Sequence, residues 1–118
     1  MDKWVKKLVT EGLPVLQKLN PSKIIIFGSR ARGDAEEYSD IDVIVVSDFF
    51  RNTPFLKRMP LVLRMLNFEK HIDFLCYTQE EFEKIKENSV IVRQALKEGV
   101  EIFPRIPPVE VEDENEES

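Results

Sequence analysis

The sequence predicts a small α/β (α+β) domain, with a short mixed β-sheet and helices that pack mainly on one face. Short runs of apolar, often β-branched residues indicate buried strands, and between them apolar residues recur every three or four positions, as in helices. The chain has 118 residues, of which 42% are hydrophobic and 33% charged. This is the size and composition of one globular domain, which we place at residues 1–106.

The expected elements follow one another closely along the chain. Strands are predicted at residues 24–27, 40–46 and 71–77, with a short edge strand at 100–103. Helices are predicted at residues 2–19, from residue 30, at 54–66, from residue 79 and at 90–97. Gly12 and Pro14 interrupt the first helix, which either kinks there or consists of two short helices.

Capping residues support several of these boundaries. We expect Ser29 to cap the short helix that begins at Arg30, and Thr78 and Glu81 to form a capping box. Gly99 is expected to end the last helix as a C-terminal cap. In the helix at 54–66, one apolar stripe forms either part of the core or a partner interface: Leu56, Met59, Leu63 and Leu66. Pro60 argues against an unbroken helix there.

Charge is distributed unevenly along the chain. The segment Pro107–Ser118 holds six acids and no Lys or Arg, whereas the remainder has 16 acids and 17 bases. We expect this acidic tail to be disordered. A nearly neutral body makes non-specific nucleic-acid binding unexpected, because such binding depends on basic charge.

The chain shows no sign of export or membrane insertion. Cys76 is the single cysteine, so no internal disulfide forms, and its place in an apolar run predicts a core residue. No apolar run approaches the ~20 residues that span a bilayer. The N-terminus lacks the apolar stretch of a signal peptide. We therefore expect a cytoplasmic protein.

Two acids open the second predicted strand. Asp40 and Asp42 point to the same face, with Cα atoms ~7 Å apart. Two such carboxylates repel each other unless a cation lies between them, and Mg²⁺ is the default hard cation for carboxylate and phosphate oxygens. Asp73 lies in the otherwise apolar third strand. It either completes a three-carboxylate site, which suits two-metal chemistry at phosphorus, or pairs with an Arg or Lys.

The turn after the first strand suits a phosphate. Gly28 permits close approach to the main chain, and Ser29 adds a hydroxyl at a helix N-terminus. Arg30 and Arg32 are expected either to contact phosphate or to lie on the solvated surface. Of the other polar residues, Tyr38 is a loop residue or stacks on a base, and His71 is exposed or at a sheet edge.

Together, Gly28-Ser29, Asp40-x-Asp42 and Asp73 resemble the signature of the minimal nucleotidyltransferase family, in the DNA polymerase beta-like superfamily. The likeness runs from about residue 5 to 103. The resemblance implies the polymerase beta-like fold, with Gly28 and Ser29 binding nucleotide phosphates. It also implies that Asp40, Asp42 and Asp73 bind one or two Mg²⁺ ions, and that Asp73 helps to deprotonate the acceptor hydroxyl.

The resemblance also implies partners. Members of this family are often antitoxins of HEPN-domain toxins, and some transfer AMP from ATP to a tyrosine of the toxin. We therefore expect Mg²⁺-dependent transfer of a nucleoside monophosphate, from ATP by preference, to a hydroxyl of a protein acceptor. A chain without an acceptor domain is expected to work in an oligomer or a complex. The alternative is a binding module that neutralises its partner with weak catalysis or none.

Overall fold

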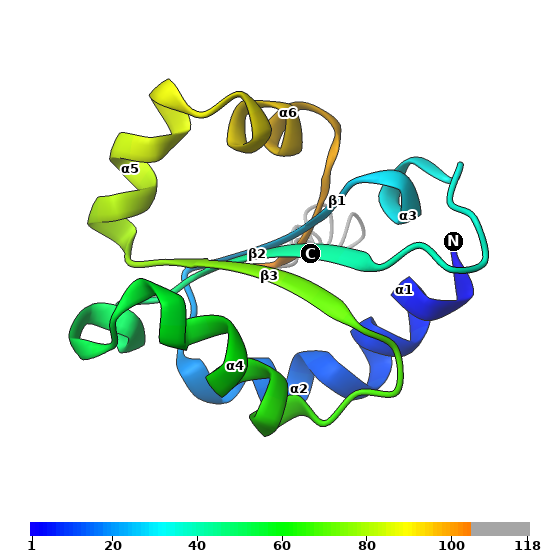
Figure 1. The fold of residues 1–118 in the computed structure, drawn as a ribbon, viewed down its shortest axis with the longest axis horizontal. Coiled ribbons are helices and arrows are strands. Elements are labelled where there is room, and N and C mark those ends of the chain that lie inside the picture. Colours follow the sequence, from blue (N-terminus) through cyan, green and yellow to red (C-terminus); the bar gives the residue numbers. More distant parts are fainter. Residues whose placement is uncertain (105–118) are drawn as a thin grey trace, which may run out of the picture.

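The computed structural model describes residues 1–104, which form a four-stranded mixed sheet with helices above and below it (Figure 1). The strands are β1 (Lys23–Phe27), β2 (Ile41–Val46), β3 (Ile72–Tyr77) and β4 (Val100–Phe103). Their order across the sheet is β3-β2-β1-β4. The predicted fold class and mixed sheet are confirmed. The predicted acidic tail at 107–118 lies outside the described residues.

Strand directions follow from the connections between them. β1 is antiparallel to both β2 and β4, whereas β2 and β3 are parallel. The connection from β2 to β3 contains η3 (Asp48–Asn52) and α4 (Phe55–Leu66), and a helical crossover of this kind is what a parallel pair requires. The parallel pair is in register from Ile41 opposite Ile72 to Val46 opposite Tyr77.

The larger core lies between one face of the sheet and the N-terminal helices together with α4. Ile41, Val43 and Val45 of β2 point into it, as predicted from the alternation along the strand. The N-terminal helical segment consists of α1 (Lys3–Lys7), η1 (Leu8–Gly12), α2 (Leu13–Leu16) and η2 (Gln17–Leu19). The predicted interruption is a π-helical turn at η1, directly before Pro14, which has no N–H to donate.

The other face of the sheet carries α5 (Gln79–Asn88) and α6 (Val90–Glu98). Phe82, Val92 and Ala95 of these helices pack with Ile25 and Ile44. The expectation that helices lie mainly on one face is therefore incomplete. Strands that are apolar on both sides give no sign of which helix covers which face.

The capping box of Thr78 and Glu81 and the Ser89 cap of α6 are both present. Gly99 is the C-cap of α6, as predicted, but without the left-handed conformation, since its φ is −78°. A Cβ there would lie 2.4 Å from the Ala95 carbonyl oxygen and 2.9 Å from that of Ile26, so the glycine allows the end of α6 to lie close to β1. No helix within residues 1–104 has both the length and the apolar character to span a membrane.

In α4 the buried face differs from the predicted stripe. Arg58, Val62 and Leu66 are buried, whereas Leu56 is 86% exposed. The helix is unbroken around Pro60. Pro60 has no N–H, so the carbonyl of Leu56, four residues earlier, receives no hydrogen bond within the helix. Because Leu56 is exposed, water can bind this carbonyl instead.

Arg58 connects α4, β3 and α5 through one buried guanidinium group. It donates to the carbonyl oxygens of Thr53 (2.8 Å) and Cys76 (3.1 Å). It also donates to both carboxylate oxygens of Glu81, at 2.6 and 3.1 Å. The hydrogen bond from Arg58 lowers the pKa of Glu81. This ion pair therefore stabilises the fold at neutral pH and is lost as Glu81 becomes protonated in acid.

We expect Arg58→Met to lower the free energy of unfolding by about 2–3 kcal/mol, because two carbonyls and a carboxylate lose a charged donor. Urea unfolding at pH 7 measures this change. Arg64→Met, an exposed position on the same helix, is the matched control and should shift stability by less than about 0.5 kcal/mol. Equal stability of the two variants would contradict a structural role for Arg58.

Candidate active site

The site is built around the turn that follows β1. Gly28 has φ +79° and ψ −163°, a region open almost only to glycine, and α3 (Ser29–Arg32) begins directly after it. α3 starts at Ser29, one residue before the start predicted at Arg30. Gly28, and not Ser29, therefore occupies the N-cap position. The expected Ser29 side-chain cap is therefore wrong. Ser29 lies in the first turn of the helix instead.

The turn lies against the second acid of the motif. Asp42 on β2 is the register partner of Phe27 at the end of β1. A Cβ added to Gly28 would lie 2.3 Å from Asp42 Oδ2. Gly28 is thus required both for its backbone angles and for the room that it leaves for the carboxylate.

Parallel pairing of β2 and β3 brings the third acid to the same place. Asp42 and Asp73 are direct register partners, and Asp40 immediately precedes β2. Ligand atoms of Asp40, His71 and Asp73 all lie within 4.8 Å of one another. β2 and β3 are therefore neighbours, as a three-carboxylate site requires, and the three acids share one face at one end of the sheet.

Burial and the neighbouring acids affect the pKa of Asp42 in the same direction. Burial raises the pKa of Asp42, and the charges of Asp73 and Asp40 raise it further. The charge of Arg32 acts in the opposite direction. A divalent cation among these groups would remove the repulsion.

His71 joins the acids, although the sequence suggested only an exposed or edge position. Its Nε2 lies 3.0 Å from Asp73 Oδ1, and both side chains are exposed. The sequence could have predicted this, because side chains alternate along a strand and residues 71 and 73 therefore share a face. The other lone titratable residue, Cys76, is buried as predicted, and burial raises its pKa to about 12.

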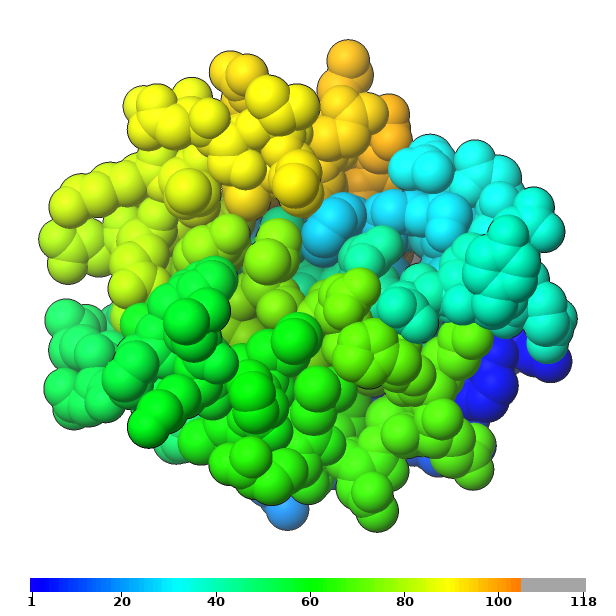
Figure 2. Space-filling model, viewed as in Figure 1, coloured from blue at the N-terminus to red at the C-terminus, as the bar shows by residue number. Residues whose placement is uncertain are grey.

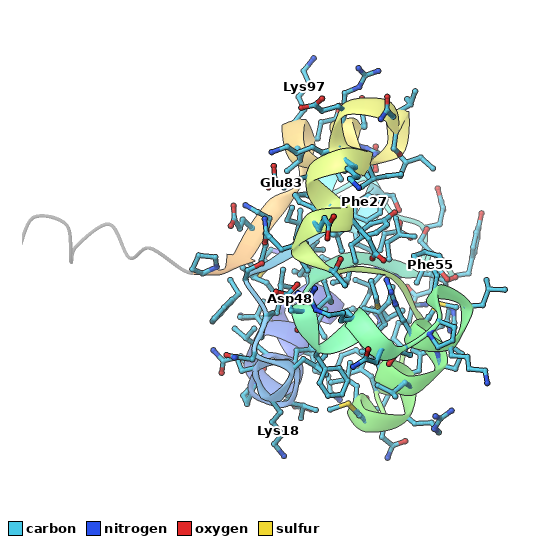
Figure 3. All side chains as sticks on the ribbon, turned by 90° about the vertical axis from the view of Figure 1, so that its left-hand side faces the viewer. Lys18, Phe27, Asp48, Phe55, Glu83 and Lys97 are labelled. Carbon is cyan, nitrogen blue, oxygen red and sulfur yellow. The ribbon has the colours of Figure 1, made fainter. Side chains whose placement is uncertain are left out.

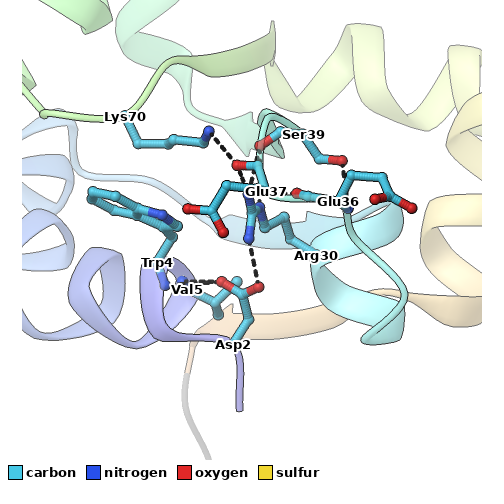
Figure 4. A network of polar contacts seen from close by, with 8 residues as sticks. All are labelled: Asp2, Trp4, Val5, Arg30, Glu36, Glu37, Ser39 and Lys70. Carbon is cyan, nitrogen blue, oxygen red and sulfur yellow. Dashed lines mark hydrogen bonds and ion pairs between the residues drawn. The ribbon is translucent and has the colours of Figure 1, made fainter.

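Arg30 was expected either to contact phosphate or to lie on the solvated surface, and the structure shows neither. It is buried, and its guanidinium donates to the carbonyl oxygens of Glu36, Glu37 and Ser39 at 2.9–3.1 Å (Figure 4). It also donates to Asp2, at 2.9 Å. The placement of Arg30 as a phosphate-binding residue is therefore corrected, because its donors are turned into the protein. Arg30 fixes the loop that leads to Asp40.

The loop held by Arg30 keeps its own side chains outside. Tyr38, whose neighbours Glu37 and Ser39 provide two of the bound carbonyls, is 79% exposed.

Asp2 lies at the other end of this hydrogen-bond network. Burial alone would raise the pKa of Asp2, but hydrogen bonds from Arg30 and from the amides of Val5 and Trp4 lower it. The start of α1, α3 and the loop before β2 are thus joined by one charged group.

Arg32 remains beside the acids. Its side chain is exposed and pairs with Asp34 at 3.3 Å, and it lies 3.9 Å from Glu98 of α6. A guanidinium with only exposed partners exchanges them for a phosphate at little cost. Of the two arginines predicted to contact phosphate, Arg32 has an exposed side chain, whereas Arg30 is buried.

A family model described as the nucleotidyltransferase domain matches residues 9–107 of the sequence. The chain belongs to the nucleotidyltransferase domain family. Nucleotidyl transfer is accordingly its reaction class. The match spans the turn at Gly28 and all three acids of the motif.

Solved structures similar to this chain include one with a TM-score above 0.5, which supports the fold. A candidate nucleotidyltransferase from Sulfolobus solfataricus is 21% identical, with a TM-score of 0.53, and the similarity covers 84% of this chain and 82% of that one. Another candidate nucleotidyltransferase is 26% identical, with a TM-score of 0.48, over 69% of this chain and 89% of the other. BolA1 from Arabidopsis thaliana is 24% identical, with a TM-score of 0.49, over 62% and 93%. No curated protein matches this chain.

The donor set of this nucleotidyltransferase fits a divalent metal ion. Asp40, Asp42 and Asp73 offer carboxylate oxygens, the ligands that Mg²⁺ prefers, and Asp42 lies against the Gly28 turn. His71 adds one nitrogen to the cluster.

Gly28→Ala should destabilise the nucleotidyltransferase by about 2 kcal/mol, because alanine is strained at this φ and ψ and its methyl group displaces Asp42. Urea unfolding measures the loss. Gly33→Ala is the matched control, since Gly33 also has a positive φ (+90°) but no atom lies within 4 Å of an added Cβ. It should cost only about 1 kcal/mol. Equal losses would show that contact with Asp42 is unimportant.

Asp42→Asn should stabilise the metal-free protein at pH 7 by about 0.5–1 kcal/mol, because it removes repulsion between cross-strand carboxylates. A raised pKa means that the contribution of Asp42 to stability is lost as pH rises. The gain should therefore disappear below the ordinary aspartate value of 3.8. Thermal unfolding with EDTA at several pH values tests this. Asp48→Asn, at the opposite end of β2, should give no gain.

Proposed function

We propose that this protein transfers a nucleoside monophosphate from ATP to a hydroxyl group, in a reaction that depends on Mg²⁺. The observation that carries the proposal is the meeting of the Gly28 turn with Asp42 and Asp73 from two adjacent strands. A glycine turn that admits a phosphate and carboxylates that hold a cation are the two parts that this chemistry needs.

Each site residue has a distinct role in the proposed reaction. Gly28 and Ser29 bind the triphosphate through the turn, and Arg32 adds positive charge to it. Asp40, Asp42 and Asp73 would hold one or two Mg²⁺ ions: ligand atoms of Asp40 and Asp73 lie within 4.8 Å of each other, and Asp42 is the register partner of Asp73. A bound Mg²⁺ would neutralise charge on the phosphate oxygens.

The bond changes are those of a displacement at phosphorus. The acceptor oxygen forms a bond to the α-phosphorus, the bond from that phosphorus to the bridging oxygen breaks, and pyrophosphate leaves. Asp73 accepts the hydroxyl proton on its carboxylate. The contact from His71 Nε2 to Asp73 Oδ1, at 3.0 Å, orients that carboxylate.

We propose that a partner protein carries the acceptor hydroxyl, and a HEPN-type toxin is the partner that the sequence resemblance favours. An exposed apolar surface supports this proposal. Phe55 and Leu56 of α4 line a cavity of about 310 Å³ that also reaches Asp73. A protein segment seated there would bring a side-chain hydroxyl close to the carboxylates.

The same surface supports the second candidate function, neutralisation of a partner by binding alone. β3 is an edge strand, and exposed Leu56 and Phe55 lie beside it. In this case the acids matter little for the biological effect. A triple Asp40→Asn, Asp42→Asn, Asp73→Asn variant that still neutralises the partner in cells would favour binding over catalysis.

Label transfer tests the catalytic proposal. The purified protein, Mg²⁺ and ATP labelled at the α-phosphate are added to a lysate of the source organism. We expect a labelled protein band that Asp42→Asn reduces at least about 100-fold and that EDTA abolishes, because the cation site is lost in both cases. Asp48→Asn should label as the wild type does.

Circular dichroism of both variants shows whether the fold is intact. A band of equal strength with Asp42→Asn would overturn the proposed site. Absence of any labelled acceptor, with no ATP-dependent heat in calorimetry, would overturn the proposed function as a whole.

A further inference from the structure

Next to the acids, a cavity lies between the end of β1 and α6. Its volume is about 310 Å³, and Phe27, Gly28, Ile91, Gln94 and Glu98 are among its lining residues. This is at the lower end of the range for ligand pockets, about 300–1,000 Å³. In Figure 2, atoms at the end of β1 (blue) are visible between those of α6 (yellow to orange) and those of α3 (cyan).

The cavity is continuous with the proposed triphosphate site. Gly28 belongs to both, and Arg32, which lies beside Asp42, also lines the cavity. A ligand whose phosphates rest on the Gly28 turn therefore has this cavity within reach of its other end. The inference that follows rests on the proposed function.

The walls of the cavity are apolar, and part of them is unusually exposed. Val90 is 71% exposed and Ile91 is 59% exposed, side by side at the start of α6. Phe27 is partly buried beneath them and packs against the smaller core. Adjacent exposed aliphatic side chains next to an aromatic ring offer a surface on which a flat heterocycle can be buried.

One side of the cavity is polar, and hydrogen-bond acceptors dominate it. Gln94 donates a hydrogen bond to Glu98, one turn further along α6, and Glu98 lies 3.9 Å from Arg32. The Glu98 carboxylate only accepts hydrogen bonds, and Gln94 has an amide oxygen and a second N–H left to offer. This edge therefore fits a ligand with a donor next to an acceptor.

We propose that this cavity binds the base of the nucleotide and selects adenine. The exocyclic amino group of adenine donates to Gln94 or Glu98, and the adjacent ring nitrogen accepts from the Gln94 amide, a pairing well suited to a Gln side chain. Uracil also has a donor next to an acceptor, but its single N–H is flanked by two carbonyl oxygens, one of which would face the Glu98 carboxylate, whereas the amino group of adenine has two N–H donors. The cavity thus determines base specificity, whereas the Gly28 turn and the acids serve any triphosphate.

Calorimetry with three ligands in the presence of Mg²⁺ tests the proposal on the full chain. The ligands are ATP, UTP and inorganic tripolyphosphate, which has the phosphates but no base. We expect the wild type to bind ATP about tenfold more tightly than UTP, the scale of one bidentate base contact. Gln94→Ala should reduce that preference, because one of the two polar contacts to the base is lost, and should leave tripolyphosphate binding unchanged.

Lys97→Ala is the matched control on the same helix. Lys97 projects from the outer end of the molecule, away from Phe27 (Figure 3), and should leave all three affinities unchanged. Ile91→Ala removes part of the apolar wall and should weaken ATP binding without affecting tripolyphosphate. Gln94, Lys97 and Ile91 are all exposed, so the variants keep the core intact.

The outcomes separate this inference from the proposed function. If Gln94→Ala and Ile91→Ala bind ATP and UTP as the wild type does, the base pocket is wrong, while tripolyphosphate binding still supports the phosphate site. If the wild type binds none of the three ligands, the proposed function fails and the base pocket fails with it.

Discussion

The parallel, in-register pairing of β2 with β3 is the constraint on which the site depends. It places Asp42 opposite Asp73 on one face, while Ile41, Val43 and Val45 enter the core on the other. A slip of one residue would turn the acids towards the larger core. The same burial that stabilises the sheet therefore holds like charges together, and the site does not need a separate scaffold.

Two buried arginines hold the irregular segments against this sheet. Arg58 fixes the start of α4 and the capping box of α5, and Arg30 fixes the loop before Asp40. Both donate to main-chain carbonyls as well as to a carboxylate, so their burial leaves few donors unused. Among the described residues, no buried side-chain nitrogen or oxygen lacks a hydrogen-bond partner. The rigidity of the loops thus comes from charge and main-chain contacts.

Local patterns were sufficient to predict the strands, the capping box, and the common face of the acids on β2 and β3. The roles of Arg30 and Arg58 could not be predicted, because their partners are main-chain carbonyls and acids up to 28 residues away in sequence. Gly99 ends α6 as predicted, but it is selected by close packing and not by a left-handed turn, and both select glycine. Leu56 is exposed while Leu66 of the same stripe is buried, because a single helical stripe does not reveal which of its members faces solvent.

The contact between Asp2 and Arg30 ties the chain's second residue to the loop before the acids. Asp2 also caps α1 through the amides of Trp4 and Val5. A chain shortened to begin at Lys3 would lose both the cap and the charge that balances the buried guanidinium. Loss of this turn would thus act on the loop that leads to Asp40 from a segment that lies outside the sheet.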